Sequence, residues 1–177
     1  NLNMTFMIDR PYSPTAAYSP TSSTAPSYNL LEAIYQALYY KFNSNEPILI
    51  EIDALDEING IQLTVDIGER CEFEIVTIIK GSTNWMGLLR TGRIGNGSNI
   101  NDITVGLQER GTLLRVDAIS LGRDAEFRTG TVSSGSERTK ADLRYRMGEI
   151  GSNLRVIGSI LSRDSMHLDH HIEIQHD

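Results

Sequence analysis

Apolar and polar residues alternate along most of the chain after residue 47, a pattern typical of half-buried β-strands. The alternation is clearest at 48–53, 61–67 and 73–79. Similar patterns predict further strands at 102–107, 112–121, 125–132, 153–161 and 167–175. Between the first two strands lies Asn59-Gly60, a dipeptide favoured in tight hairpin turns. We therefore expect mainly antiparallel pairing.

Helical spacing of apolar residues occurs before this region. Leu30, Leu31, Ile34 and Leu38 recur at the intervals of one helix face, and Asn29 with Glu32 resembles a capping box. We predict a helix over 29–42 and a second over 137–148, with Ser136 as its cap. The stretch 81–101 is rich in loop-forming residues, with a helical turn expected at 85–89. The predicted fold class is α+β: one or two mostly antiparallel sheets with one or two packed helices.

The segment 10–28 has a different composition. It holds four of the five prolines and many Ser and Thr residues, so it has little to bury in a core. We predict a flexible arm with polyproline character over 1–28, followed by one globular domain over 29–177. We interpret residues 1–3 as a cloning remnant, with Met4 as the natural start.

Charge narrows the range of functions. The 177 residues carry a net charge of −7, which argues against nonspecific binding to nucleic acid or to an anionic membrane. No apolar run approaches the roughly 20 residues of a transmembrane helix. Acidic residues dominate 46–74, whereas a basic contact patch is predicted from Arg138, Lys140, Arg144, Arg146 and Arg155. These two regions are either ordinary solvated faces or surfaces through which copies associate head to tail.

Candidate catalytic residues do not form a recognisable motif. Gly92–Ser98 is rich in glycine but lacks the Lys-Ser/Thr ending of a phosphate-binding loop, so a surface or contact loop is favoured. The carboxylate pairs Glu51/Asp53 and Glu72/Glu74 fit a solvated sheet face, and Cys71, the single cysteine, has no evident base partner. We expect no catalytic residues, no cofactor and no enzymatic activity.

All four histidines fall within the last eleven residues: His167, His170, His171 and His176. Their spacing matches no zinc motif. On a strand, His167, Asp169 and His171 would share a face and His170 would point the other way. Exposed histidines, a pH-sensitive contact and a metal site remain the alternatives, and no metal is expected.

Two apolar residues, Trp85 and Met86, lie in the loop-rich stretch near Gly81 and Gly87. An exposed apolar loop of this kind can dock on a membrane or on a neighbouring subunit. Core burial is the other interpretation.

The arm carries the one resemblance to a known family. Ser23-Thr24-Ala25-Pro26-Ser27-Tyr28, with Ala33-Ile34-Tyr35 shortly after it, resembles the late-domain region of matrix proteins of enveloped negative-strand RNA viruses. Rhabdovirus matrix proteins, including those of plant cytorhabdoviruses, are the group considered. In these proteins a Pro-rich arm precedes a compact α+β domain.

The resemblance implies a viral matrix protein that self-assembles between nucleocapsid and envelope, supports virion assembly and budding, and also resides in the host cytoplasm and at its membranes. The implied partners are further copies of the chain, the nucleocapsid, the membrane or a glycoprotein tail, and host sorting machinery. In this interpretation the arm binds a neighbouring subunit through Pro11, Tyr12, Pro14, Tyr18, Pro20, Pro26 and Tyr28. The alternatives are a coat or capsid subunit, or a cellular interaction module phosphorylated at Ser13 and Ser19.

Overall fold

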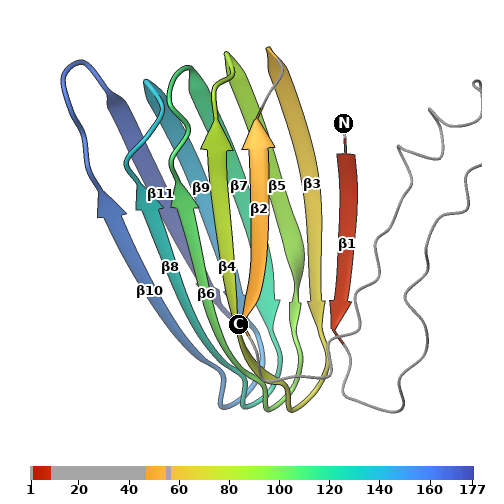
Figure 1. Ribbon diagram of the computed structural model, residues 1–177. Helices are drawn as coiled ribbons and strands as arrows, with labels where there is room; N and C mark the ends of the chain where they lie inside the picture. The colour runs from red at the N-terminus through yellow and green to blue at the C-terminus, as the bar shows by residue number, and fades with distance from the viewer. Residues whose placement is uncertain (1, 9–46, 55–56) are drawn as a thin grey trace, which may run out of the picture.

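A computed structural model describes residues 2–8, 47–54 and 57–177, and most of them lie in two facing β-sheets (Figure 1). Sheet A has six strands in the order β1-β3-β5-β7-β9-β11, and sheet B has five in the order β10-β8-β6-β4-β2. Every neighbouring pair is parallel. The strands are β1 (Leu2–Ile8), β2 (Ile48–Ala54), β3 (Ile58–Ile67), β4 (Glu72–Gly81), β5 (Trp85–Ile94), β6 (Asn99–Gly106), β7 (Thr112–Leu121), β8 (Glu126–Ser133), β9 (Arg138–Met147), β10 (Asn153–Ile160) and β11 (His167–His176).

From β2 onward the chain alternates between the two sheets, so each turn consists of one strand of sheet B followed by one of sheet A. Equivalent strands of successive turns then pair in parallel. This arrangement is a β-solenoid, and a strand always pairs with one from the next turn rather than with its neighbour in sequence.

The turn has a nearly constant length of 27 residues. Ile58 pairs with Trp85, and Trp85 with Thr112. In sheet B, Glu72 pairs with Asn99 and Asn99 with Glu126. The connections from sheet A to sheet B repeat as well, since the backbone adopts positive φ at the same place in four successive turns: Arg70 (54°), Gly97 (65°), Asp124 (54°) and Gly151 (76°).

The core lies between the sheets and follows from the alternation in sequence. In β4, Phe73, Ile75, Thr77 and Ile79 are buried while the intervening residues are partly or fully exposed. The same pattern in β5, β7 and β9 directs Met86, Leu113 and Leu143 inward. Side chains on the other face of each strand form the outer surfaces of the solenoid.

The expected α+β fold with antiparallel sheets is wrong, because the described residues form parallel sheets and no helix. Residues 137–148, expected to be helical, form β9, and the expected loop and helical turn at 85–89 begin β5. Asn59-Gly60 makes no hairpin but lies within β3, opposite Met86 and Gly87. The remaining predicted strands are present, although their partners differ from those expected.

Two other expectations concern the N-terminal part of the chain. The predicted helix at 29–42, the arm residues from Pro11 to Tyr28 and the expected domain boundary lie outside the described residues. Within the stretch assigned to the arm, Leu2–Ile8 form β1, which pairs with β3. No described segment is a helix of the length and apolarity needed to span a membrane.

Close strand spacing makes Gly92 irreplaceable. Its φ is 158°, and a Cβ atom there would lie 1.7 Å from the carbonyl oxygen of Val65 on the adjacent strand. Gly87, on the same strand, has open space, with the nearest atom 3.8 Å away.

We therefore expect Gly92→Ala to lower the free energy of unfolding by at least the 1–3 kcal/mol or so typical of a strained backbone. Gly87→Ala should have little effect. Urea titration followed by circular dichroism checks both, and equal effects of the two variants would contradict the close approach seen at Gly92.

Candidate interaction surfaces and buried polar cluster

Charged residues cross the interior between the two sheets. Arg90 of β5, only 2% exposed, donates from Nη2 to Asp102 Oδ2 of β6 at 2.8 Å and from Nη1 to Thr104 Oγ1 at 2.6 Å. Arg115 of β7 donates to Asp117 through Nε at 2.9 Å and Nη2 at 2.6 Å. Arg90 Nε lies 3.6 Å from Asp117 Oδ2, which joins the two pairs into one buried cluster.

The cluster contains two arginines and two aspartates, so its formal charges cancel. Burial alone would raise the pKa of Asp117, but Arg115 and Arg90 hold it below its ordinary value. Burial likewise opposes the charge of Arg90, but the carboxylates of Asp102 and Asp117 raise its pKa above the ordinary value. Burial, reinforced by the charge of Asp117, raises the pKa of Tyr145 to about 12. These groups keep their protonation states at neutral pH, so the arginines and aspartates stay charged and paired in the folded state.

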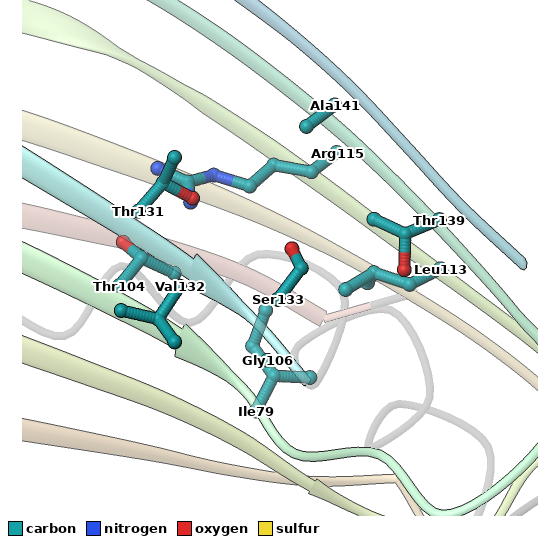
Figure 2. A pocket seen from close by; sticks show the side chains of 10 residues that line it. All are labelled: Ile79, Thr104, Gly106, Leu113, Arg115, Thr131, Val132, Ser133, Thr139 and Ala141. Atoms are coloured by element: carbon teal, nitrogen blue, oxygen red, sulfur yellow. The ribbon is translucent and has the colours of Figure 1, made fainter. Parts of the chain in front are cut away.

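A small cavity adjoins the cluster (Figure 2). It has a volume of about 10 Å³ and is lined by Arg115, Thr131, Ser133 and Thr139 among others. Thr139 Oγ1 is buried and has no hydrogen-bond partner among the described residues. A space of this size has room for about one water molecule, so it is not a substrate pocket.

Removing one carboxylate from the cluster should be costly. Asp117→Asn leaves Arg90 and Arg115 buried without their shared counter-charge, and we expect a loss of about 3–5 kcal/mol in unfolding free energy. Asp142→Asn, at an exposed ion pair with Arg144, should change stability little. Chemical denaturation at pH 7 measures the unfolding free energy of both variants. Similar losses would show that the buried cluster contributes no more to stability than an exposed ion pair.

The outer face of sheet A brings together two sets of residues expected to make contacts. Trp85, 48% exposed, lies beside Ile58 in register. Leu89, Leu114 and Val116 extend this apolar patch across β5 and β7. Arg138, Lys140, Arg144 and Arg146 lie on the outer side of β9, on the same face.

Most of these cations are paired with acidic neighbours. Lys140 contacts Asp169, Arg144 lies near both Asp142 and Glu173, and Arg146 contacts Asp177. The outer positions of strands β3 to β11 carry five cations and four carboxylates, with histidine neutral: Arg93, Arg138, Lys140, Arg144, Arg146, Asp66, Asp142, Asp169 and Glu173. This face is therefore nearly neutral and not a strongly basic surface.

An open hollow of about 350 Å³ lies on the same face. Its lining includes the small residues Gly92, Ala118 and Ser120 and the longer side chains of Arg144, Arg146 and Glu173. The ion pairs of Arg144 and Arg146 with neighbouring carboxylates already use their charges. Neither of these two arginines therefore offers the hollow an unpaired positive charge with which to bind an anion.

The outer face of sheet B carries a second apolar surface, which we call the aliphatic band. Two adjacent rows of outward-facing residues run across its five strands. The first row is Leu49, Val76, Ile103, Gly130 and Ile157, and the second is Glu51, Ile78, Val105, Val132 and Ser159. Leu49, Ile103 and Ile157 are 58%, 45% and 55% exposed. Contiguous exposed aliphatic side chains of this kind mark contact surfaces.

Other residues singled out in the sequence lie apart from these surfaces. Met86 is 1% exposed and belongs to the core, so it does not join Trp85 in a surface contact. Arg155 lies on β10 of sheet B, away from the four cations of β9. Gly95–Ser98 form a turn between sheets, in which Ser98 Oγ donates to the Gly68 carbonyl oxygen and accepts from the Cys71 amide. Glu51, of one carboxylate pair, forms an exposed ion pair with Lys80.

The histidines lie on β11 as the alternation predicted. His171 Nδ1 is 3.4 Å from Asp142 on the outer side, whereas His170 points inward and its Nε2 is 2.8 Å from Ser133 Oγ. Within the described residues, no group of three His, Cys, Asp or Glu side chains could hold a metal ion. Burial and the nearby Arg115 lower the pKa of His170, although Asp169 opposes this effect.

The folded state disfavours the protonated form of His170. The contribution of neutral His170 to the free energy of unfolding is therefore complete above the ordinary histidine pKa of about 6.5, and this contribution is lost as the pH falls below that value. We expect unfolding free energy to fall between pH 7.5 and 5.5, and His170→Gln to reduce that fall. His167→Gln, an exposed control, should behave like wild type. Thermal melts at both pH values measure this, and the same pH response in all three proteins would contradict it.

Comparisons with protein families, with curated proteins and with solved structures found no match to this chain. The structure alone therefore defines the class, which is a parallel two-sheet β-solenoid with a neutralised charged interior and two apolar outer surfaces.

Proposed function

We propose that this chain is a non-enzymatic structural scaffold that works by contact with other protein surfaces, chiefly through the aliphatic band. The observation that carries the proposal is the placement of seven aliphatic side chains in two adjacent rows on the solvent side of sheet B. A sheet face that needs only to be soluble normally carries polar residues at such positions.

The interior supports a structural function as well. The buried arginines and aspartates are paired with one another, and the cavity beside them has room for about one water molecule. The charged side chains inside the solenoid thus interact with one another, and the outer faces remain for recognition.

Only the broader part of the matrix-protein interpretation enters this proposal, namely a structural protein that acts through contacts with other proteins. The resemblance implied a compact α+β domain, whereas the described residues form a parallel solenoid. The arm motifs that carried the resemblance lie outside the described residues.

Ile103 provides the test because it lies at the centre of the aliphatic band and is exposed. In an extract of cells that express the chain, we expect wild type to elute from gel filtration in a complex larger than the monomer. Ile103→Asp should elute at the monomer position because a charge there opposes burial. Ile58→Asp, an equivalent change on the outer face of sheet A, should elute like wild type.

Equal elution of wild type and Ile103→Asp would overturn the assignment of the band as the principal contact surface. Circular dichroism of each purified variant controls for loss of fold, since Ile103 and Ile58 are both solvent-exposed and neither is a core residue.

A further inference from the structure

We infer that the partner of the aliphatic band is a second copy of this chain, bound face to face about a twofold axis parallel to the strands of sheet B. This inference rests on the proposed function and adds the identity of the partner and the register of the contact. The rows of sheet B are largely complementary to themselves when the strand order is reversed.

Such a twofold axis reverses the order of the strands but keeps each row opposite itself. With the axis over the central strand β6, strand β4 of one copy faces β8 of the other, and β2 faces β10. Isologous contacts of this type require a surface that is complementary to itself.

The first row of the band meets this requirement in shape. Val76 of β4 faces Gly130 of β8, so a branched side chain lies opposite a position that has none. Ile103 faces its own equivalent, and Leu49 faces Ile157. In the second row Ile78 faces Val132 and Val105 faces itself.

The neighbouring row towards the strand starts is complementary in charge. It contains Glu74 on β4, Asn101 on β6, Arg128 on β8 and Arg155 on β10. Reversal sets Glu74 of each copy opposite Arg128 of the other, and Asn101 opposite Asn101. Arg128 also contacts Glu126 of its own chain, so its guanidinium lies between two carboxylates when the copies meet. The two equivalent Glu74–Arg128 contacts flank the apolar contact and favour this register over others.

The outermost row is unfavourable, since it sets Glu72 opposite Glu126. Both residues lie at the first position of their strands, at the rim of the face, where salt screens their repulsion. Glu126 is also paired with Arg128 within its own chain.

The size of the face is adequate for a specific dimer. Five strands about 4.8 Å apart, with eight residues at about 3.3 Å each in β6, cover roughly 600 Å² per copy. Two copies would bury roughly 1,200 Å², above the approximately 1,000 Å² expected of a biological interface and near the lower end of stable ones. We therefore expect a reversible dimer.

The test exchanges the charges of the flanking pair in the full purified chain. Alone, Glu74→Arg places two arginines opposite each other at both ion pairs, and Arg128→Glu does the same with two glutamates. Each variant should dimerise at least about tenfold more weakly than wild type at low salt. An equimolar mixture of the two variants restores both pairs, so it should form a mixed dimer with an affinity close to that of wild type.

Sedimentation velocity over a concentration series measures these affinities, with melting temperatures to confirm that each variant is folded. Arg93→Glu, which reverses a charge on the outer face of sheet A, away from the aliphatic band, is the matched control and should dimerise like wild type. A wild-type dimer with no recovery in the mixture would overturn the register and leave the proposed scaffold function intact. A monomeric wild type at all concentrations would overturn self-association. The extract experiment with Ile103→Asp then decides independently whether the band binds another protein.

Discussion

The constant length of the solenoid turn is the constraint on which the rest of this structure depends. Because equivalent residues 27 positions apart lie side by side on adjacent parallel strands, each row across a sheet is built from one position of the repeat. A residue type that fits one position of the repeat therefore recurs at the equivalent position of neighbouring turns, or a neighbouring side chain in the same row compensates for its absence. The apolar core, the positive-φ turns and the two apolar outer surfaces all follow from this in-register stacking.

The buried cluster contributes something that the apolar core does not. Aliphatic residues tolerate a shift between turns, since one branched side chain can replace another at modest cost. Arg90 and Asp102 cannot shift in this way, because even a slip of two residues, which keeps every side chain on its own face, would move the guanidinium roughly 7 Å from its carboxylate. We attribute to the cluster a role in fixing the alignment of sheets A and B at the middle of the stack. Pairing of the four charges offsets much of the free-energy cost of removing them from water.

The sequence predicted strand positions well and strand partners poorly, for a physical reason. Alternation shows that a segment is half-buried, but it is the same for parallel and antiparallel neighbours. The repeat was detectable in principle, since Gly68, Gly95 and Gly122 each follow an apolar residue at intervals of 27, yet few other identities recur. Residues 137–148 contain good helix formers such as Lys140, Leu143 and Arg144, and only their neighbours in the stack make them a strand.

The candidate surfaces were only partly accessible from sequence for the same reason. Trp85 could be singled out as an aromatic residue in an expected loop, and the sequence shows apolar residues, Val76 and Ile78, at the alternate positions of one strand. Neither observation could bring Leu49, Ile103 and Ile157 together, because these residues lie far apart in the chain and meet only through the 27-residue register.

The departures from the constant spacing show where this architecture can accept change. Along sheet A, Thr112 pairs with Arg138 at a spacing of 26 and Arg138 with His167 at 29, whereas Glu126 and Asn153 of sheet B keep the spacing of 27. The differences are absorbed by the connections on either side of β9 and before β11, and the ladders continue without interruption. Insertions and deletions can thus accumulate at these corners during evolution, or foreign peptides can be grafted there, while the strands remain in register.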